Sequence, residues 1–165
     1  MIRLLLVLAT LVFFVLCALA MRWGWRNRVR RQSYLPAFPD APEAEPADLL
    51  LPEQHGVYVG TTLAGDWQDR VAVGGVGLRA TATVKLAREG LLFDREGASR
   101  VWIPAESLRD ARTDRALAGK VMGIDGLLVV RWQVGDYEFD SGFRGDDKDV
   151  YGEWVTAVRS LAGQS

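Results

Sequence analysis

Few side chains in this sequence are able to carry out nucleophilic or metal-dependent catalysis. His55 is the only histidine and Cys17 is the only cysteine, so one chain holds neither a His-dependent catalytic triad nor a metal site with several histidines. Cys17 also lies in a long apolar run, which removes it as a thiol nucleophile. Asp146, Asp147 and Asp149 lack the glycine and the terminal glutamate of an EF-hand calcium loop. We therefore predict no catalytic residue, no metal ligand and no cofactor site, and we expect a protein that is not an enzyme.

Two glycine-containing stretches resemble nucleotide-binding motifs in their letters alone. Gly75-Val-Gly-Leu-Arg-Ala80 matches a dinucleotide fingerprint, whose glycines must be followed directly by a helix that holds the pyrophosphate at its N-terminus. Here the next residues predict a strand instead. Ala118-Gly-Lys-Val121 lacks both the Ser or Thr after the lysine and the earlier glycine of a phosphate loop. We expect a loop before a strand at the first stretch and a turn between strands at the second.

One short stretch combines an aromatic side chain with charges. Asp66, Trp67, Asp69 and Arg70 fall in a predicted loop or strand edge. One interpretation places Trp67 in the core and pairs Asp69 with Arg70 locally. The other makes these residues a partner-binding patch, because aromatic side chains and arginine are enriched at the centres of interfaces.

A second candidate group is basic. Arg112, Arg115 and Lys120 flank another predicted loop, and Arg144 follows Phe143. If these side chains converge, they are able to bind a phosphate or an acidic peptide. If they lie apart, they are ordinary solvated charges. Arg115, Lys120 and Arg144 join the Trp67 stretch as candidate partner-binding residues.

The net charge of −1 is the sum of three unlike segments of the 165-residue chain. Residues 1–31 hold six arginines and no acid (+6), residues 32–52 hold four acids and no base (−4), and residues 53–165 hold 14 bases and 17 acids (−3). The acidic excess after residue 31 excludes a basic protein that coats nucleic acid, so we expect no nucleic-acid partner. A single cysteine excludes a disulfide framework, and this length suits one ordinary domain.

Residues 4–21 are predicted to form a transmembrane helix. They hold no charged side chain, and at ~1.5 Å per residue they span ~27 Å, close to the ~30 Å hydrocarbon core of a bilayer. One arginine before this run and five after it orient the N-terminus outside and the remaining chain in the cytoplasm, as in a single-pass protein of the plasma membrane. The predicted membrane-interface residues are Arg22, Trp23, Trp25, Arg26, Arg28, Arg30 and Arg31.

A cleavable signal peptide is the alternative to a retained anchor. Ala18-Leu-Ala20 has the small-x-small form that signal peptidase reads, and cleavage near Ala20 would export the domain. Against cleavage, the segment before the apolar run is only Met-Ile-Arg, and the mature protein would begin with an arginine cluster that resists translocation. These arginines either set the topology alone or also attract anionic lipid, at ~1 kcal/mol each.

Residues 32–54 are predicted to form a linker. Five of the six prolines lie between Pro36 and Pro52, interleaved with alanines and the four acids. Proline at every third or fourth position blocks helix and sheet and favours an extended chain. We expect a semi-rigid spacer whose acids are repelled by anionic lipid, in preference to a proline-motif ligand.

Residues 55–165 are predicted to form one domain of short antiparallel strands. Alternating apolar and polar residues predict strands at 56–62, 71–73, 79–86, 90–93, 100–103 and 107–111. Between 127 and 143 the pair Gly135-Asp136 supplies a two-residue hairpin turn, which places Trp132 opposite Phe139 and Arg131 opposite Asp140. One face of this hairpin is then apolar core, and the other faces water.

The last 20 residues change to a helical period. Val150, Trp154, Val158 and Leu161 form an apolar stripe, Asp146 and Asp147 offer an N-cap, and Gly163 marks the end. About seven strands followed by one amphipathic helix is the arrangement of a pleckstrin-homology-like (PH-like) barrel or sandwich. The predicted fold class is therefore mainly β (α+β), preceded by one transmembrane helix.

Several separated stretches resemble, in the same order, a family of actinobacterial single-pass membrane proteins with a PH-like domain. They are Tyr58-Val-Gly-Thr-Thr-Leu-Ala-Gly-Asp-Trp-Gln-Asp-Arg70, Ile103-Pro-Ala105, Ala118-Gly-Lys-Val121, Gly126-Leu-Leu-Val-Val-Arg-Trp132 and Asp140-Ser-Gly-Phe-Arg144. The resemblance covers residues 56–162 and the anchor-and-linker layout. It implies members encoded beside pyrimidine-biosynthesis genes, described as membrane or export proteins and without an assigned catalytic residue.

The sequence as a whole indicates a binding module. We expect a non-enzymatic, membrane-anchored scaffold whose cytoplasmic domain presents a surface to a protein partner, while residues 4–21 contact the bilayer. An export or transport accessory protein is the first alternative, and a module that binds an anionic ligand or lipid is the second. Specific headgroup recognition is disfavoured, because Arg70 and Arg79 in the predicted first hairpin are offset by Asp66 and Asp69.

Overall fold

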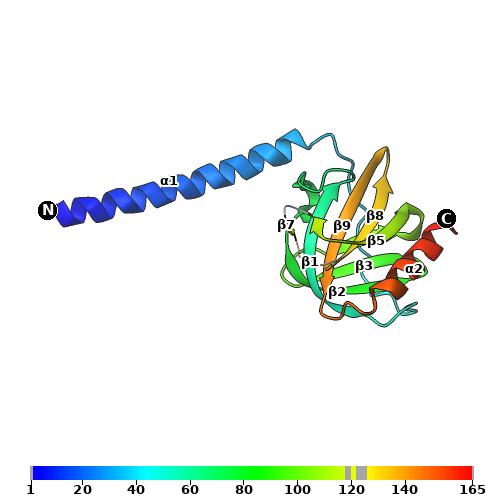
Figure 1. Cartoon of the computed structure of the whole chain (residues 1–165). Coiled ribbons are helices and arrows are strands. Elements are labelled where there is room, and N and C mark those ends of the chain that lie inside the picture. Colours follow the sequence, from blue (N-terminus) through cyan, green and yellow to red (C-terminus); the bar gives the residue numbers. More distant parts are fainter. Residues whose placement is uncertain (1, 118–119, 122–125, 165) are drawn as a thin grey trace. The chain divides into compact units, whose positions relative to one another are not determined.

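The computed structural model describes residues 2–117, 120–121 and 126–164. Its contacts divide the chain into two units, Met1–Tyr34 and Leu35–Ser165. The first unit is built on a single helix, α1 (Ile2–Arg31), whose 30 residues include the predicted apolar run (Figure 1). Among the described residues, α1 is the one helix long and apolar enough to cross a membrane, and an N-terminal signal sequence has the same properties.

The second unit is built on a seven-stranded antiparallel sheet, as predicted. Its strands, in chain order, are β1 (Gln54–Leu63), β2 (Ala80–Ala87), β3 (Gly90–Arg95), β4 (Val101–Pro104), β5 (Leu108–Asp114), β8 (Leu127–Val134) and β9 (Tyr137–Gly145). They lie in the order β4-β3-β2-β1-β9-β8-β5, so β1 joins two meanders. A three-residue 3-10 turn, η2 (Ala105–Ser107), connects the two edge strands β4 and β5 directly. The sheet must therefore curl until its edges approach each other, and the core fills the inside.

The predicted hairpin register is confirmed. Trp132 pairs with Phe139 and Arg131 pairs with Asp140 across β8 and β9. The turn works because Gly135 has a φ of 56°, a left-handed conformation that glycine adopts at little cost. Trp132 and Phe139 are both fully buried, with ring centroids 5.1 Å apart, so the apolar face of the hairpin lies in the core.

The C-terminal helix, α2 (Tyr151–Ala162), packs on β5 and covers the core. Its buried side chains are Tyr151, Trp154, Val158 and Leu161, and Gly163 is its C-cap. The predicted N-cap is wrong: Val150 occupies that position, and no side chain caps the helix. Asp147 instead accepts a hydrogen bond from the Asp149 amide, which closes a turn before the helix begins. Arg159 on the outside of α2 pairs with Asp110 of β5 at 2.7 Å.

The predicted strand at 71–73 is also wrong. The backbone there turns through a 3-10 element, η1 (Val73–Gly75), after a single bridge between Thr62 and Arg70. Gly74 and Gly75 have φ values of 65° and 68°, which end any extended run because residues with a Cβ rarely adopt them. The alternation in the sequence at this point is too short to outweigh two adjacent glycines.

Residues 35–53, which we call the strap, lie against the domain, which differs from the extended spacer that the sequence predicts. Leu35 is buried in the core, and the Phe38 ring lies 5.5 Å from Trp132 and 5.2 Å from Phe139 between ring centroids. Near the other end of the strap, the backbone amide of Leu50 donates to the carbonyl of Leu86 in β2. Proline does stop the strap from forming a helix, but its apolar side chains find partners on the sheet.

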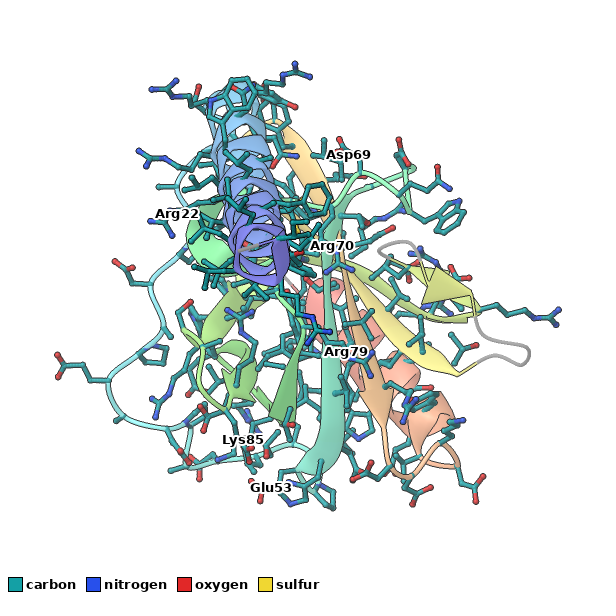
Figure 2. The ribbon with its side chains drawn as sticks, turned by 90° about the vertical axis from the view of Figure 1, so that its left-hand side faces the viewer. Arg22, Glu53, Asp69, Arg70, Arg79 and Lys85 are labelled. Atoms are coloured by element: carbon teal, nitrogen blue, oxygen red, sulfur yellow. The ribbon has the colours of Figure 1, made fainter. Side chains whose placement is uncertain are left out.

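The acids of the strap pair with the domain. Glu45 forms an ion pair with Lys85, whose ammonium also lies 3.4 Å from Glu53 (Figure 2). Arg100 donates to the carbonyl oxygens of Pro42 and Glu43. Glu45 and Glu53 therefore neutralise Lys85 of β2, and Glu45 also lies 3.9 Å from Arg100, a role that composition did not suggest.

The outer face of the hairpin is only partly in water, contrary to prediction. A short pair of strands, β6 (Ala116–Leu117) and β7 (Lys120–Val121), forms a second sheet. Leu117 packs with Val59, Leu127 and Val129 in a second, smaller core on this face. Next to it Asp140 is 3% exposed. Glycine at position 142 leaves the space for this packing, because a Cβ there would come 2.5 Å from a Leu117 methyl carbon.

Candidate functional site

The loop that follows β1 holds four of the candidate binding residues on a hydrogen-bonded frame. The Asp66 carboxylate accepts the backbone amides of Gln68 and Asp69 at 2.9 and 3.3 Å, as in an Asx turn. The backbone amide of Leu63 donates to the Asp69 carbonyl, and that of Ala64 donates to the carbonyl of Glu138 near the start of β9. These bonds tie the loop to the sheet at both of its ends.

Trp67 projects from this frame. The interpretation that buries Trp67 in the core is wrong, because its side chain is 39% exposed. Trp67 directly follows Asp66, inside the turn that the Asp66 carboxylate closes with the amides of Gln68 and Asp69. A large aromatic side chain on a fixed loop loses little conformational freedom when it binds a partner, which is the property of an interface anchor.

Arg70 secures the other side of the same loop. Its guanidinium donates to the Gly77 carbonyl at 2.8 Å, and Gly77 has no room for a Cβ, since one would lie 1.9 Å from the Val71 carbonyl oxygen. Figure 2 shows Asp69 and Arg70 at one end of β1 and the Lys85–Glu53 pair at the other. Arg70 thus contributes to loop structure as well as to surface charge.

The second candidate group lies at the opposite end of β9. Arg144 is exposed on β9 across from Val57, and Arg115 is exposed directly after β5. The side chain of Lys120 is outside the described part of the structure. From Glu138, which holds the Trp67 loop, to Arg144 the strand runs six residues, about 20 Å at ~3.3 Å per residue. The structure therefore divides the candidate residues into two separate places.

Arg112 is removed from the basic group by an internal ion pair. Arg112 and Arg131 both bind the Asp140 carboxylate, at 2.9 Å in each case. Burial by itself would raise the pKa of Asp140, but the hydrogen bonds from Arg131 and Arg112 outweigh it and hold the pKa below its ordinary value. This arrangement stabilises the sheet and leaves neither arginine free for an external anion.

A chain of buried hydrogen bonds crosses the core, and the sequence did not reveal it. The Trp132 indole donates to Ser141 Oγ at 2.9 Å, Ser141 bonds Thr61 at 2.7 Å, Thr61 bonds Tyr58, and the Tyr58 hydroxyl donates to the Val76 carbonyl at 2.8 Å. An indole N–H is only a donor and a carbonyl is only an acceptor, so every hydroxyl proton points toward Val76. Burial raises the pKa of Tyr58 despite the hydroxyls of Thr61 and Ser141 and the nearby arginines.

The glycine-rich stretch before β2 accepts hydrogen bonds from a buried arginine of the same domain. Arg95 is 4% exposed and donates to the carbonyl oxygens of Gly75 and Leu78, at 3.0 and 3.1 Å. Its guanidinium also lies 4.9 Å from the centre of the Tyr58 ring. The element after the glycines is the strand β2 and not a helix, as predicted. Within the described residues no cluster of His, Cys, Asp and Glu has the makings of a metal site.

The predicted membrane-interface residues all fall within α1, because the helix continues to Arg31. Trp23 and Trp25 are 69% and 40% exposed. The side chain of Arg28 lies outside the described part of the structure. The arginines therefore extend the apolar helix as a basic helical end and do not form a separate loop.

The fold defined by these elements is a curled seven-stranded antiparallel sheet covered by a C-terminal helix, the architecture of a PH-like domain. The sequence profile of the bacterial PH domain-like family matches residues 35–159, three quarters of the chain. The chain belongs to this family, and the match begins at Leu35, where the strap joins the core. The curated proteins include no match to the chain.

Proposed function

We propose that this protein is a membrane-anchored, non-enzymatic scaffold whose PH-like domain binds a protein partner through the loop after β1. The observation that carries the proposal is Trp67, a large aromatic side chain left 39% exposed on a loop that hydrogen bonds hold in place. Asp66, Asp69 and Arg70 around it supply polar groups for the rim of an interface. The family supports a binding module in general, and the choice of a protein partner rests on this loop.

The anchor in this proposal is α1. Its length and apolar composition suit a membrane span, and its basic C-terminal end favours a cytoplasmic domain by the positive-inside rule. An export or transport accessory role is the second candidate, because the same helix fits a signal sequence. Topology decides part of this choice: a phosphatase reporter fused after Ser165 should be inactive in the first candidate, and an active reporter would favour an exported domain.

Partner binding is tested by site-specific crosslinking in cells. A photoreactive phenylalanine derivative at position 67 should capture one protein reproducibly, and the same group at Thr156, exposed on α2, should not. Asp66→Ala should weaken that capture by releasing the loop, even though the photoreactive group stays at position 67. Equal capture of the same proteins from both positions, or capture that ignores Asp66→Ala, argues against the loop as a docking surface.

A further inference from the structure

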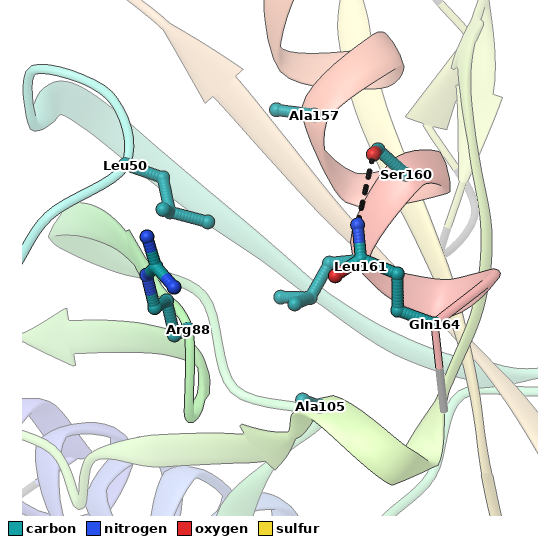
Figure 3. Close-up of a pocket in the computed structure, with 7 residues that line it drawn as sticks. All are labelled: Leu50, Arg88, Ala105, Ala157, Ser160, Leu161 and Gln164. Atoms are coloured by element: carbon teal, nitrogen blue, oxygen red, sulfur yellow. Dashed lines mark hydrogen bonds between the residues drawn. The ribbon is translucent and has the colours of Figure 1, made fainter.

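A groove on the C-terminal helix lies apart from the loop after β1. It has a volume of about 520 Å³ and lies between the last turns of α2 and two other segments, the strap and the β2–β3 turn. Figure 3 shows Leu50 and Arg88 on one wall facing Leu161 and Gln164 on the other. The remaining lining residues are Ala105, Ala157 and Ser160. Sites for small ligands have volumes of ~300–1,000 Å³, so the groove has room for one or two amino-acid side chains.

The lining of the groove combines apolar side chains with hydrogen-bond donors. Leu50 is 41% exposed, so it offers apolar surface to a ligand, and it faces the apolar side chain of Leu161. Arg88 is exposed and makes no hydrogen bond or ion pair within the described residues. Gln164 donates to Ser160 Oγ at 3.4 Å, so the Ser160 hydroxyl proton stays available. A ligand with an apolar group and a hydrogen-bond-accepting anion satisfies all of these side chains.

The surrounding charges select the kind of anion. Arg88 is the only charged residue of the seven that line the groove, and the acids Glu89 and Glu106 adjoin lining residues in the chain. The C-terminal end of α2 adds a partial negative charge to the same wall. One guanidinium matches one carboxylate as a two-bond fork. A doubly charged phosphate would meet too much negative charge here.

We propose that this groove binds the carboxyl-terminal end of a partner polypeptide, with an apolar last side chain between Leu50 and Leu161 and its carboxylate on Arg88. Ser160 and Gln164 then face the peptide backbone, whose carbonyl and amide groups they are able to bond. A fatty acid fits less well, because the exposed polar lip formed by Arg88, Ser160 and Gln164 would leave its chain against water and polar atoms.

The test uses the full chain in lipid nanodiscs, labelled with ¹⁵N, and N-acetyl-Ala-Leu-Val as the probe. Addition of the probe should shift the Arg88 side-chain N–H and the Gln164 side-chain amide in a saturable way. The same peptide with a C-terminal carboxamide should bind about tenfold more weakly, because it lacks the charge that Arg88 recognises. Arg88→Gln should abolish this difference, whereas Arg144→Gln, a change at an exposed arginine outside the groove, should preserve it.

Three outcomes overturn the proposal. In the first, the peptide acid and its carboxamide bind equally to the unaltered chain. In the second, the Arg88→Gln variant still prefers the peptide acid. In the third, decanoate shifts the Arg88 and Gln164 side-chain resonances while the peptide does not. The last outcome would assign the groove to an apolar acid and not to a polypeptide. Because Arg88 is exposed, its variant should fold, and the dispersion of the same spectra checks this. The result is independent of Trp67, so the proposed function stands or falls separately.

Discussion

Phe38 offers a direct measurement of whether the strap belongs to the folded domain. Its ring is partly buried between Trp132 and Phe139. A fully buried Phe→Ala change costs ~3–5 kcal/mol, and each aromatic pair contributes ~0.5–1.5 kcal/mol. Because part of the ring is in water, we expect Phe38→Ala to lower the free energy of unfolding by about 2 kcal/mol.

Gly74 makes the prediction sharper. A Cβ at this position would lie 2.6 Å from Cδ2 of Phe38, and Gly74 has a φ of 65°. Gly74→Ala should therefore cost ~1 kcal/mol in backbone strain and ~1–2 kcal/mol more in steric overlap with Phe38. In a chain that already carries Phe38→Ala the overlap is gone and only the strain remains. The double variant should thus be more stable than the sum of the single changes by about 1 kcal/mol or more.

Urea unfolding of the full chain in detergent micelles, followed by near-UV circular dichroism, measures all four corners of this cycle. Leu78→Ala serves as the control, because Leu78 is 47% exposed and its loss should change stability by less than ~0.5 kcal/mol. If Phe38→Ala matches this control and the two changes add without coupling, the strap is a free spacer and the docking inferred from the structure is wrong.

Further predictions concern charges, the buried network and the anchor. Asp140→Asn should destabilise the domain by about 2 kcal/mol at neutral pH, less than the loss of a fully buried pair, because the side chains of Arg112 and Arg131 are 31% and 32% exposed. The folded-state pKa of Asp140 lies below its unfolded value, so the ionised carboxylate stabilises the domain fully at neutral pH, and this stabilisation disappears as the pH falls below ~4. In urea titrations the difference in stability between wild type and Asp140→Asn should therefore shrink below pH ~4. Tyr58→Phe should cost ~1–3 kcal/mol, because the buried Thr61 hydroxyl loses its acceptor and the Val76 carbonyl keeps only the Thr61 amide as donor. Burial keeps Tyr58 protonated, so this cost should decline above pH ~10, where the unfolded tyrosine ionises. A retained anchor predicts an intact mass for the membrane-extracted protein, whereas cleavage near Ala20 would remove the apolar run.

Local sequence patterns predicted the β8–β9 hairpin and the C-terminal helix, which depend mainly on neighbouring residues. Gly135 and the alternation around it determine the β8–β9 register, and the spacing from Trp154 to Leu161 determines the buried face of α2. The strap was missed because its contacts are long-range: the ion pair between Glu45 and Lys85 joins residues 40 apart. No local pattern distinguishes a proline-rich segment that docks from one that does not.

For the candidate binding residues too, residue types are visible in the sequence, whereas exposure and long-range contacts are not. Residue type singled out the stretch around Trp67, but sequence alone left open whether Trp67 is buried or exposed, and the loop that presents it is held by the turn that Asp66 closes. Arg112 separates from the rest of the basic group, because it is bound to Asp140, a residue 28 positions away whose burial depends on packing across the sheet. The groove beside α2 brings together Leu50, Arg88 and Gln164, which no sequence motif connects.

The position of β1 in the sheet sets the order of events during synthesis. β1 pairs with β9, which ends at Gly145, and the core is covered only by α2, which ends at Ala162. The sheet is therefore unable to close until β9 has left the ribosome, the core stays uncovered until α2 has followed, and α1 emerges before any of these pairs exist. Any targeting factor that recognises α1 thus meets a bare apolar helix on a nascent chain whose domain is still unfolded. A truncation that removes α2 should leave recognition of α1 intact while exposing the core to proteases.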